Sequence, residues 1–476
     1  MPGGTSEQGA SILTGMARQR VIVAGGGLSG LAAAFDLVRG GADVRVLEAS
    51  GRPGGVVGTI ERDGFRFETG PNTVPASAES FRRLCGDLGI AERLIASSPA
   101  GDERYLFLRG RLRRLPSSPA AFLLSPVLSP LGRLRVITEP FRRFRRPPAD
   151  QVEPTLAAFV AERLGPEAAQ VLAGAFVRGV YAAELDELGA RSAFPRMWKA
   201  CEQHGGLVRG LVAAARRPKP ILPGPTVRRT ALISFQRGLV EIVEALRDAL
   251  GERLRTGQPV ERLERTPSGW TVHTRSEGSL AADRVVLAVP APVAAGWLEG
   301  LGAAERIVDS VRGIAHADVT LVHFGLEAGA LRARPHGFGY LVPPRAGEDA
   351  PRALGSLFPS NLFPGRAPEG CVAVSSFYAS VDVEGLDAPA LARLACEDLA
   401  RALGESRLPT PRVVETRRWR DVIPRYAPGH AARMEEVETR MRRDLPGLRL
   451  AGCYVAGVSV DDVIARGRAV AREILG

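Results

Sequence analysis

The 476 residues are too many for one ordinary hydrophobic core, so the sequence predicts two or three domains. The hydrophobic fraction of 45% and the charged fraction of 24% are typical of a folded protein and exclude global disorder. The net charge of +11 comes mostly from arginine. It fits a GC-rich genome, an anionic membrane surface or an acidic substrate better than nucleic acid, because the sequence contains no recognised nucleic-acid-binding module.

Cysteine and histidine are spaced in a way that predicts neither disulfides nor a metal site. The five cysteines are scattered without a C-x-x-C pair, and the six histidines form no H-x-x-x-H pair. This pattern fits a reducing cytoplasm. The first twenty residues lack the apolar core of a signal peptide, and no apolar run approaches the ~18–20 residues that span a bilayer. We therefore expect a cytoplasmic protein that is soluble or peripherally attached to the membrane.

The first expected elements are a strand, a glycine-rich turn, a helix and a second strand. Residues 21–24 and 44–47 are short apolar runs, and residues 31–38 are rich in small apolar side chains. Two such strands around one helix predict the start of a parallel sheet with a crossover helix.

The turn between the first strand and the helix contains the pattern Gly25-x-Gly27-x-x-Gly30. Gly25 permits a tight turn, Gly27 lets the backbone approach a pyrophosphate, and Gly30 lets helix and strand pack closely. The pyrophosphate then lies at the positive end of the helix dipole. Glu48 ends the second strand, where its carboxylate accepts hydrogen bonds from ribose hydroxyls and repels a phosphorylated ribose. The motif predicts a dinucleotide site that disfavours NADP.

The rest of the chain changes composition several times. Residues 96–150 are rich in proline and serine and then in arginine, with six arginines interleaved with apolar residues between 133 and 146. Residues 151–215 have the apolar spacing of helices. Further elements are expected as strands at 260, 270–274, 284–289 and 448–451, a mixture of short strands and turns over 315–420, and a closing helix from 462.

A second motif follows Glu48 directly. The pattern Glu48-x-x-x-Arg52-x-Gly54-Gly55 resembles the second half of the FAD motif in amine-oxidase-like flavoproteins, and nicotinamide dehydrogenases do not usually carry it. Residues 283–290 resemble the strand that closes the FAD sheet of these proteins. Residues 452–467 resemble their C-terminal flavin loop and helix, whose N-terminus faces the isoalloxazine ring.

Other segments resemble, in the same order, motifs of the protoporphyrinogen oxidase family. They lie at 67–73 (F-E-T-G-P-N-T), 179–182 (G-V-Y-A), 193–196 (A-F-P-R), 337–343 (G-F-G-Y-L-V-P), 363–368 (F-P-G-R-A-P), 423–430 (I-P-R-Y-A-P-G-H) and 457–464 (G-V-S-V-D-D-V-I). Three positions depart from the family pattern: Ala183 replaces Gly, Arg425 replaces Gln and Val463 replaces Cys. Residues 377–380 also lack the usual Gly-Gly.

This resemblance implies a mixed α/β fold that contains a Rossmann-like FAD-binding domain assembled from discontinuous segments. The implied parts are a disordered tail (1–19), the FAD-binding domain (20–95, 226–300 and 421–476), a helical membrane-associating domain (96–225) and a mixed-sheet substrate-binding domain (301–420). The implied contacts with FAD are Gly25, Gly27, Leu28, Ser29, Gly30, Glu48, Ala49, Arg52, Gly54, Gly55, Val56, Gly70, Pro71, Asn72, Thr73, Val260, Trp419, Gly452, Val458, Ser459, Val460 and Ile464.

The reaction that the resemblance implies is the six-electron oxidation of protoporphyrinogen IX to protoporphyrin IX, with oxygen as the electron acceptor, in heme biosynthesis. Phe338 and Leu341 would pack on pyrrole rings, Arg104 would pair with a propionate, and Gly179 would place a backbone carbonyl against the macrocycle. Each of the four also fits a plain structural role, in the core, on the surface or at a helix end. No acid, base or metal ligand is implied, and a homodimer is a further expectation.

Other activities fit parts of the pattern. A coproporphyrinogen III oxidase of the same family would need more arginines at the pocket mouth, because its substrate has four carboxylates. An amine or carotenoid oxidoreductase would share the flavin motifs but not the segments at 337–343 and 363–368. A carrier that binds flavin or porphyrin without turnover would hold FAD that substrate never reduces. The stretch 133–146 predicts either contact with an anionic membrane or a solvated helix face.

Overall fold

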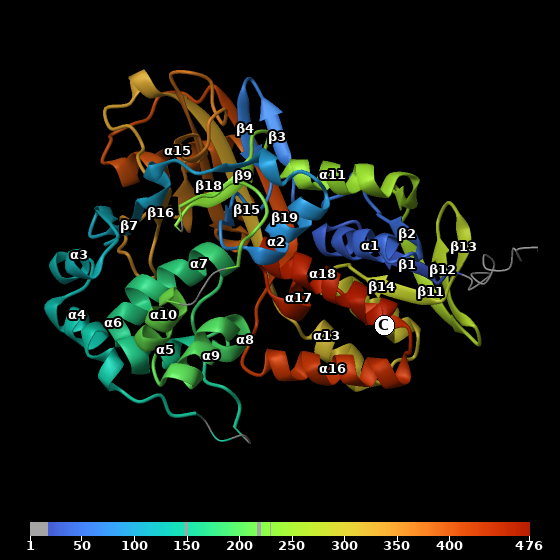
Figure 1. The fold of residues 1–476 in the computed structure, drawn as a ribbon. Coiled ribbons are helices and arrows are strands. Elements are labelled where there is room, and N and C mark those ends of the chain that lie inside the picture. The colour runs from blue at the N-terminus through green and yellow to red at the C-terminus, as the bar shows by residue number, and fades with distance from the viewer. Residues whose placement is uncertain (1–17, 147, 149–150, 217–219, 229) are drawn as a thin grey trace, which may run out of the picture.

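The computed structural model describes residues 18–146, 148, 151–216, 220–228 and 230–476 (Figure 1). The predicted disordered tail lies outside this part of the chain except for Arg18 and Gln19. Among the described residues, none of the helices is both long and apolar enough to cross a membrane. Nor do their His, Cys, Asp and Glu side chains gather into a set that could hold a metal ion.

A five-stranded parallel sheet with the order β10-β2-β1-β14-β20 forms the centre of the nucleotide-binding part. Its strands come from distant parts of the chain: β1 (Arg20–Ala24), β2 (Asp43–Leu47), β10 (Leu254–Arg255), β14 (Arg284–Leu287) and β20 (Leu448–Leu450). The carboxyl ends of parallel strands share one edge, where ligands bind in open α/β sheets. The predicted parallel sheet with a crossover helix is thereby confirmed.

Helices and a small antiparallel sheet bury the parallel sheet on both faces, which explains why its strands are nearly continuous apolar runs. One face packs against α1 (Leu28–Arg39), α2 (Glu79–Asp87), α11 (Val240–Leu250) and α18 (Val460–Leu475). The other face packs against β11 (Val260–Thr266), β12 (Gly269–Thr274), β13 (Gly278–Ala282), α12 (Ala291–Gly300), α13 (Glu305–Arg312) and α16 (His430–Asp444).

A seven-stranded mixed sheet has the order β19-β15-β18-β17-β16-β7-β8. Its strands are β7 (Arg104–Leu108), β8 (Arg111–Arg114), β15 (His316–Glu327), β16 (Gly339–Leu341), β17 (Gly355–Leu357), β18 (Cys371–Ala379) and β19 (Val413–Pro424), and α15 (Ala388–Leu403) packs on the sheet. Strands β7 and β8 fall inside the range that the sequence assigned to the helical domain. They join this sheet because β7 pairs in parallel with β16. The domain boundaries themselves stay a prediction.

Short strands and helices connect these layers. They are the hairpin of β3 (Thr59–Arg62) and β4 (Phe65–Glu68), the three-stranded sheet of β5 (Val74–Pro75), β9 (Leu232–Phe235) and β6 (Leu94–Ala96), and the helices α14 (Pro359–Leu362) and α17 (Cys453–Ala456).

Helices between residues 119 and 216 form a bundle with two apolar clusters. They are α3 (Pro119–Leu124), α4 (Pro130–Ile137), α5 (Leu156–Leu164), α6 (Pro166–Ala168), a π-helical turn (Ala169–Gly174), α7 (Ala175–Tyr181), α8 (Ala190–Ala193), α9 (Pro195–His204) and α10 (Leu207–Arg216). One cluster lies among α5 and α7–α10, and in the other α3, α4 and α6 pack with Leu106 of β7. The buried Glu139 carboxylate pairs with Arg163 and accepts the N–H groups of Leu207 and Val208 at the start of α10. This carboxylate therefore joins three segments of the bundle.

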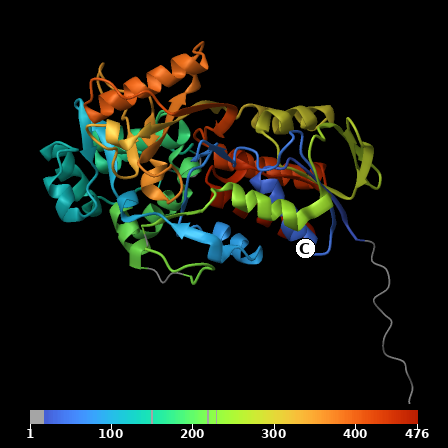
Figure 2. The ribbon, with the colours of Figure 1, turned by 90° about the horizontal axis from the view of Figure 1, so that it is seen from above.

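Figure 1 shows the bundle and the seven-stranded sheet at one end of the molecule and the parallel sheet at the other, with α17 and the start of α18 between them. Figure 2 shows the same two halves from above. Ala182, which follows α7, packs in one cluster with residues of β15 and β19, so the bundle contacts the seven-stranded sheet directly.

Candidate active site

The glycine-rich turn before α1 is shaped by close backbone contacts. Gly25 has φ +107°, and a Cβ there would overlap Ala288 O; a Cβ at Gly30 would overlap Gly25 O. Gly27 differs, because a Cβ placed there would have no protein atom within 4 Å. Two glycines thus permit the close packing of turn, helix and strand, and the third borders open space at the start of the helix.

The N-terminus of α1 presents donors to this open space. The helix begins at Leu28 after an N-cap glycine that has no side chain to bond the first-turn N–H groups. The buried Ser29 Oγ has no hydrogen-bond partner among the described residues. Free N–H groups, an unpaired hydroxyl and the helix dipole together fit a pyrophosphate. Close packing holds this end of α1 in place, since a Cβ at Gly467 of α18 would overlap Ser29 O.

Glu48 lies at the end of β2, as the sequence predicts, but protein donors already orient its carboxylate. Oε2 accepts the N–H of Gly26 at 2.7 Å, and Oε1 accepts the N–H and hydroxyl of Ser50 at 2.8 and 2.7 Å. A carboxylate has about four acceptor positions, so it retains capacity for a ribose hydroxyl. Gly26, which the motif analysis did not single out, fixes this orientation; a Cβ there would lie 2.9 Å from Glu48 Cβ.

The second motif folds back onto the first. Gly54 donates its N–H to Gly26 O at 2.7 Å and has φ +103°. Arg52 donates to Gly55 O at 2.8 Å and to Val57 O at 3.2 Å, so its guanidinium holds the turn that carries Gly54, Gly55 and Val56. Burial, assisted by the charge of Arg417, lowers the pKa of Arg52. Ala49 follows Glu48 on the segment between the two motifs.

The segment after β4 is pinned against the same turn. A Cβ at Gly70 would come within 2.5 Å of Val56 O, and Asn72 Nδ2 donates to Gly70 O at 3.1 Å. Asn72 Oδ1 is buried without a hydrogen-bond partner among the described residues. Trp419 of β19 donates its indole N–H to Thr69 O at 2.6 Å. Pro71 and Thr73, on either side of Asn72 in the sequence, are half-buried.

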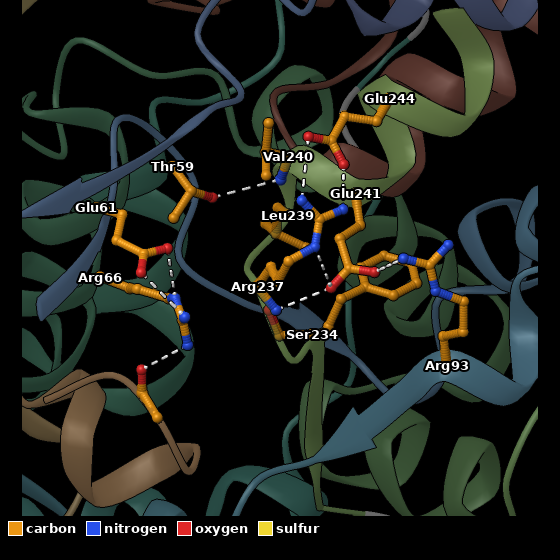
Figure 3. Close-up of polar contacts among 12 residues, drawn as sticks. Thr59, Glu61, Arg66, Arg93, Ser234, Arg237, Leu239, Val240, Glu241 and Glu244 are labelled. Atoms are coloured by element: carbon orange, nitrogen blue, oxygen red, sulfur yellow. Dashed lines mark hydrogen bonds and ion pairs between the residues drawn. The ribbon is translucent and has the colours of Figure 1, made fainter. Parts of the chain in front are cut away.

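Figure 3 shows how the β3–β4 hairpin and the start of α11 are fastened. Val240 donates its N–H to Thr59 Oγ at 3.4 Å. The buried Glu241 carboxylate accepts the N–H of Arg237 at 2.8 Å and pairs with Arg93. The first contact holds the hairpin that leads into the 69–73 loop, and the two contacts of Glu241 hold the start of α11.

The remaining predicted FAD residues are Val260 and residues of the C-terminal segment. Val260 is the first residue of β11. Two residues before it, Gln258 donates its N–H to Glu48 O at 2.8 Å. Gly452 begins the loop before α18, where Ser459 caps the helix by accepting the N–H of Asp462. Three of the predicted residues are apolar and pack inside the protein: Val460 and Ile464 in the core under the parallel sheet, and Val458 against the helical bundle.

The four predicted substrate residues form two contacts along β16, one at each end of the strand. Gly339 pairs with Arg104 in the parallel register of β16 and β7, and the Arg104 guanidinium lies over the Phe338 ring at 5.4 Å. Gly179 faces Leu341 so closely that a Cβ on the glycine would overlap the leucine side chain. Ala182 and Leu354 share an apolar cluster with Trp419, which connects this group to the loop at Thr69.

Comparison with known proteins identifies the family of the chain. The family model described as flavin containing amine oxidoreductase matches residues 28–475. Human protoporphyrinogen oxidase is 32% identical over 96% of this chain and 98% of its own length. Tobacco chloroplastic protoporphyrinogen oxidase is 28% identical (96% and 85%), and coproporphyrinogen III oxidase of Bacillus subtilis is 25% identical (96% and 98%).

Solved structures share the fold. A protein from Exiguobacterium sp. 255-15, provisionally designated a protoporphyrinogen oxidase, aligns with a TM-score of 0.80 at 23% identity over 97% of this chain and 99% of its own. Cyclohexylamine oxidase of Brevibacterium oxydans aligns with a TM-score of 0.71 at 17% identity (96% and 99%). The fold and the glycine loop define an FAD-dependent oxidoreductase. The chain belongs to the flavin-containing amine oxidoreductase family, in the branch that includes the protoporphyrinogen oxidases.

Proposed function

We propose that this protein oxidises protoporphyrinogen IX to protoporphyrin IX in porphyrin biosynthesis, with molecular oxygen as the final electron acceptor. The observation that carries the proposal is the pair of contacts along β16, with Gly179 against Leu341 near one end and Arg104 over the Phe338 ring at the other. A flat apolar macrocycle with carboxylate tails needs apolar walls and a few cations. Similarity to protoporphyrinogen oxidases over nearly the full length of the chain supports the same substrate class.

The roles follow from the chemistry of each group. FAD, when bound, accepts a hydride from a methylene bridge of the porphyrinogen. Phe338 and Leu341 bind the pyrrole rings, and Gly179 lies in the last turn of α7, where carbonyls lack intrahelical partners and can face the macrocycle. Arg104 binds a propionate with its guanidinium, which has no carboxylate partner among the described residues. No side chain is assigned as an acid or base.

The FAD-binding roles are part of the same proposal. The glycine loop and Ser29 bind the pyrophosphate, Glu48 binds ribose, and the turn held by Arg52 closes over the nucleotide. The 69–73 loop, Trp419 and the segment from Gly452 surround the rest of the cofactor. Support comes from the open space at Gly27 and from the unpaired buried atoms Ser29 Oγ and Asn72 Oδ1.

A second candidate substrate is coproporphyrinogen III, the substrate in the name of the Bacillus subtilis relative. Its four carboxylates would need cations at both ends of β16. At the end opposite Arg104, Arg178 donates to Pro343 O at 3.5 Å but also pairs with Glu184, Nε to Oε1 at 3.4 Å. Because Arg178 already has a carboxylate partner, it is less suited to bind a further carboxylate of the substrate. We therefore favour protoporphyrinogen over coproporphyrinogen.

The test is to incubate the purified yellow protein in air with protoporphyrinogen IX and, separately, with coproporphyrinogen III, and to follow porphyrin fluorescence. The proposal predicts a higher kcat/KM for protoporphyrinogen. Faster turnover of coproporphyrinogen would favour the second candidate. If FAD is bound and neither substrate is oxidised, the porphyrinogen assignment fails. That result would favour a carrier that binds flavin or porphyrin without turnover.

We further propose that the helical bundle rests on the anionic surface of the cytoplasmic membrane. Six large apolar side chains of α3, α4 and the following turn are exposed: Leu123, Leu124, Leu131, Leu134, Ile137 and Phe141. Exposed arginines follow directly, at 142, 143, 145 and 146. Apolar side chains flanked by arginine suit the interface of an anionic leaflet.

Membrane binding is tested by sedimentation with phosphatidylglycerol vesicles and with phosphatidylcholine vesicles. The wild-type protein is expected to bind the first more strongly, and Leu124→Glu with Phe141→Glu should abolish binding without loss of FAD. Equal sedimentation with and without vesicles would overturn this part of the proposal. Analytical ultracentrifugation tests the remaining expectation, a homodimer.

A further inference from the structure

Two side chains of the 423–430 motif hold the loop between β20 and α18. The Tyr426 hydroxyl donates to Cys453 O, and His430 Nε2 is hydrogen-bonded to Tyr454 O at 2.8 Å. Both acceptors lie in the short helix α17. Two consecutive carbonyls are each bonded by a side chain, which fixes the orientations of two neighbouring peptide planes.

This loop needs external support because its own backbone restrains it weakly. Gly452 and Gly457 flank α17 with φ angles of +116° and +134°. Glycine leaves the backbone freer than any other residue, so ordering these ends costs entropy. Inside the loop, the Val455 N–H reaches Gly452 O at 3.3 Å and the Gly457 N–H reaches Cys453 O at 3.2 Å, both long for backbone hydrogen bonds. Tyr426 adds a second donor to Cys453 O, and His430 supplies a donor to Tyr454 O.

Both side chains are in the protonation state that donation requires. Burial raises the pKa of the Tyr426 hydroxyl well above its usual value, so the phenol stays protonated. Burial lowers the pKa of His430 to about 4, so the imidazole is neutral at physiological pH. Because a carbonyl only accepts hydrogen bonds, the single ring proton of His430 lies on Nε2.

Tyr426 also belongs to the core of the helical bundle. The Gly189 N–H donates to Tyr426 O at 2.7 Å, and the Tyr181 ring meets the Tyr426 ring edge-on at 6.2 Å. The His430 ring lies 4.7 Å from the Tyr426 ring on the other side. Tyr426 therefore connects the helical bundle, which includes α7, with the loop that precedes α18.

We propose that Tyr426 and His430 are positioning residues for flavin reduction, which hold the 452–457 loop in the orientation that the isoalloxazine ring requires. The inference rests on the proposed function in one respect, the placement of the flavin ring against this loop. Without these side chains, Cys453 O keeps only the long bond from Gly457 and Tyr454 O loses the His430 donor, so these peptide groups turn toward other donors and the groups next to the flavin turn with them.

The chain offers a matched pair of variants. Tyr426→Phe removes the hydroxyl that bonds Cys453. Tyr454→Phe removes a buried hydroxyl of the same loop that has no hydrogen-bond partner among the described residues. Both variants lose one oxygen from a buried tyrosine, so a general effect of the substitution on folding would appear in both.

His430 provides a second, independent pair. His430→Leu removes the donor to Tyr454 O, whereas His430→Gln keeps an amide N–H at nearly the position of Nε2. A purely steric role for the ring would give two equally impaired variants. A positioning role through the hydrogen bond predicts that the Gln variant recovers most of what the Leu variant loses.

The measurements are made on the FAD-loaded proteins. The visible flavin spectrum and the reduction potential are determined with a chemical reductant and an indicator dye. The rate of flavin reduction by protoporphyrinogen is measured anaerobically by stopped flow. For Tyr426→Phe and His430→Leu we expect a changed flavin spectrum and reduction potential. We also expect the rate of flavin reduction to fall about tenfold, because each variant loses one buried hydrogen bond. KM should change little, and Tyr454→Phe should match the wild type.

Indistinguishable spectra, potentials and rates for Tyr426→Phe and Tyr454→Phe would overturn the inference. So would equal losses in the two His430 variants. If the wild-type protein holds FAD but oxidises no porphyrinogen, the proposed function fails, while the spectrum and potential still decide whether these residues act on the flavin.

Discussion

Glu68 and Arg366 form an ion pair inside the protein, with Glu68 Oε1 3.4 Å from Arg366 Nη2 and both side chains buried. Glu68 ends β4 directly before the loop proposed to contact FAD, and Arg366 belongs to the segment 363–368 after α14. Glu68 also accepts the Leu239 N–H at 3.0 Å and the Thr59 hydroxyl at 2.8 Å. The pair therefore connects the nucleotide-binding part with the seven-stranded-sheet part through one carboxylate.

The protonation of Glu68 makes the stability of the protein depend on pH. Burial, only partly offset by Arg366, raises the pKa of Glu68 from 4.5 to about 7. Between these values the folded protein binds a proton that the unfolded chain has released, so stability falls as pH rises from about 4.5 to 7. A shift of this size corresponds to a loss on the order of 3 kcal/mol across the interval.

Glu68→Gln should remove this component, so the unfolding free energy of the variant, measured by urea denaturation, should fall less between pH 5 and 8 than that of the wild type. Glu61→Gln is the control, because Glu61 lies exposed in the same hairpin and pairs with Arg66. Parallel pH profiles for wild type and Glu68→Gln would contradict the raised pKa.

Gly27→Asp should abolish FAD binding. A side chain there enters the open space before α1, and a carboxylate would repel the pyrophosphate at the helix N-terminus. The measurement is the ratio of flavin to protein absorbance after purification, which we expect to fall below a tenth of the wild-type value. Gly296→Asp on the exposed face of α12 is the control, since a Cβ there also meets open space. Yellow, fully loaded Gly27→Asp protein would refute the nucleotide site.

The glycine turn could be predicted from the sequence because its motif is local, three glycines at a fixed spacing between a strand and a helix. Within the turn, a Cβ at Gly30 would overlap Gly25 O, whereas the overlap of a Cβ at Gly25 with Ala288 O, just after β14, depends on the fold. By contrast, β7 lay in a stretch expected to be helical, because only its pairing with β16, more than two hundred residues away, makes it part of a sheet. Gly26, Tyr426 and His430 lie inside motifs that the sequence shows, but their roles depend on partners brought together by the fold, so the motifs did not indicate these roles.

Arg104→Ala should raise KM for protoporphyrinogen about tenfold, or more, and leave FAD content unchanged, because a charge-assisted hydrogen bond to a propionate contributes roughly 1.5–3 kcal/mol. Steady-state kinetics and the flavin absorbance ratio measure the two effects. Arg111→Ala is the matched control, since Arg111 is exposed on the neighbouring strand β8. An unchanged KM in Arg104→Ala, or an equal increase in Arg111→Ala, would remove the proposed role of Arg104.

Gly179→Ala should impair substrate binding without destabilising the protein. The new Cβ overlaps the Leu341 side chain, which must swing away from the surface proposed to bind pyrrole rings. Alanine is a better helix former than glycine by about 1 kcal/mol, so the melting temperature should stay the same or rise. KM should increase severalfold while FAD content is retained.

Leu341→Ala and the double variant with Gly179→Ala and Leu341→Ala complete a double-mutant cycle, in which KM is compared among the four proteins. Once Leu341 is shortened, the alanine at 179 has space, so its further effect should be small and the two changes should not add. Additive effects on KM would mean that Gly179 acts independently of Leu341, for example only through its backbone carbonyl. A fall in the melting temperature of Gly179→Ala would instead mean that the overlap disrupts the packing of α7 on β16 rather than the binding surface.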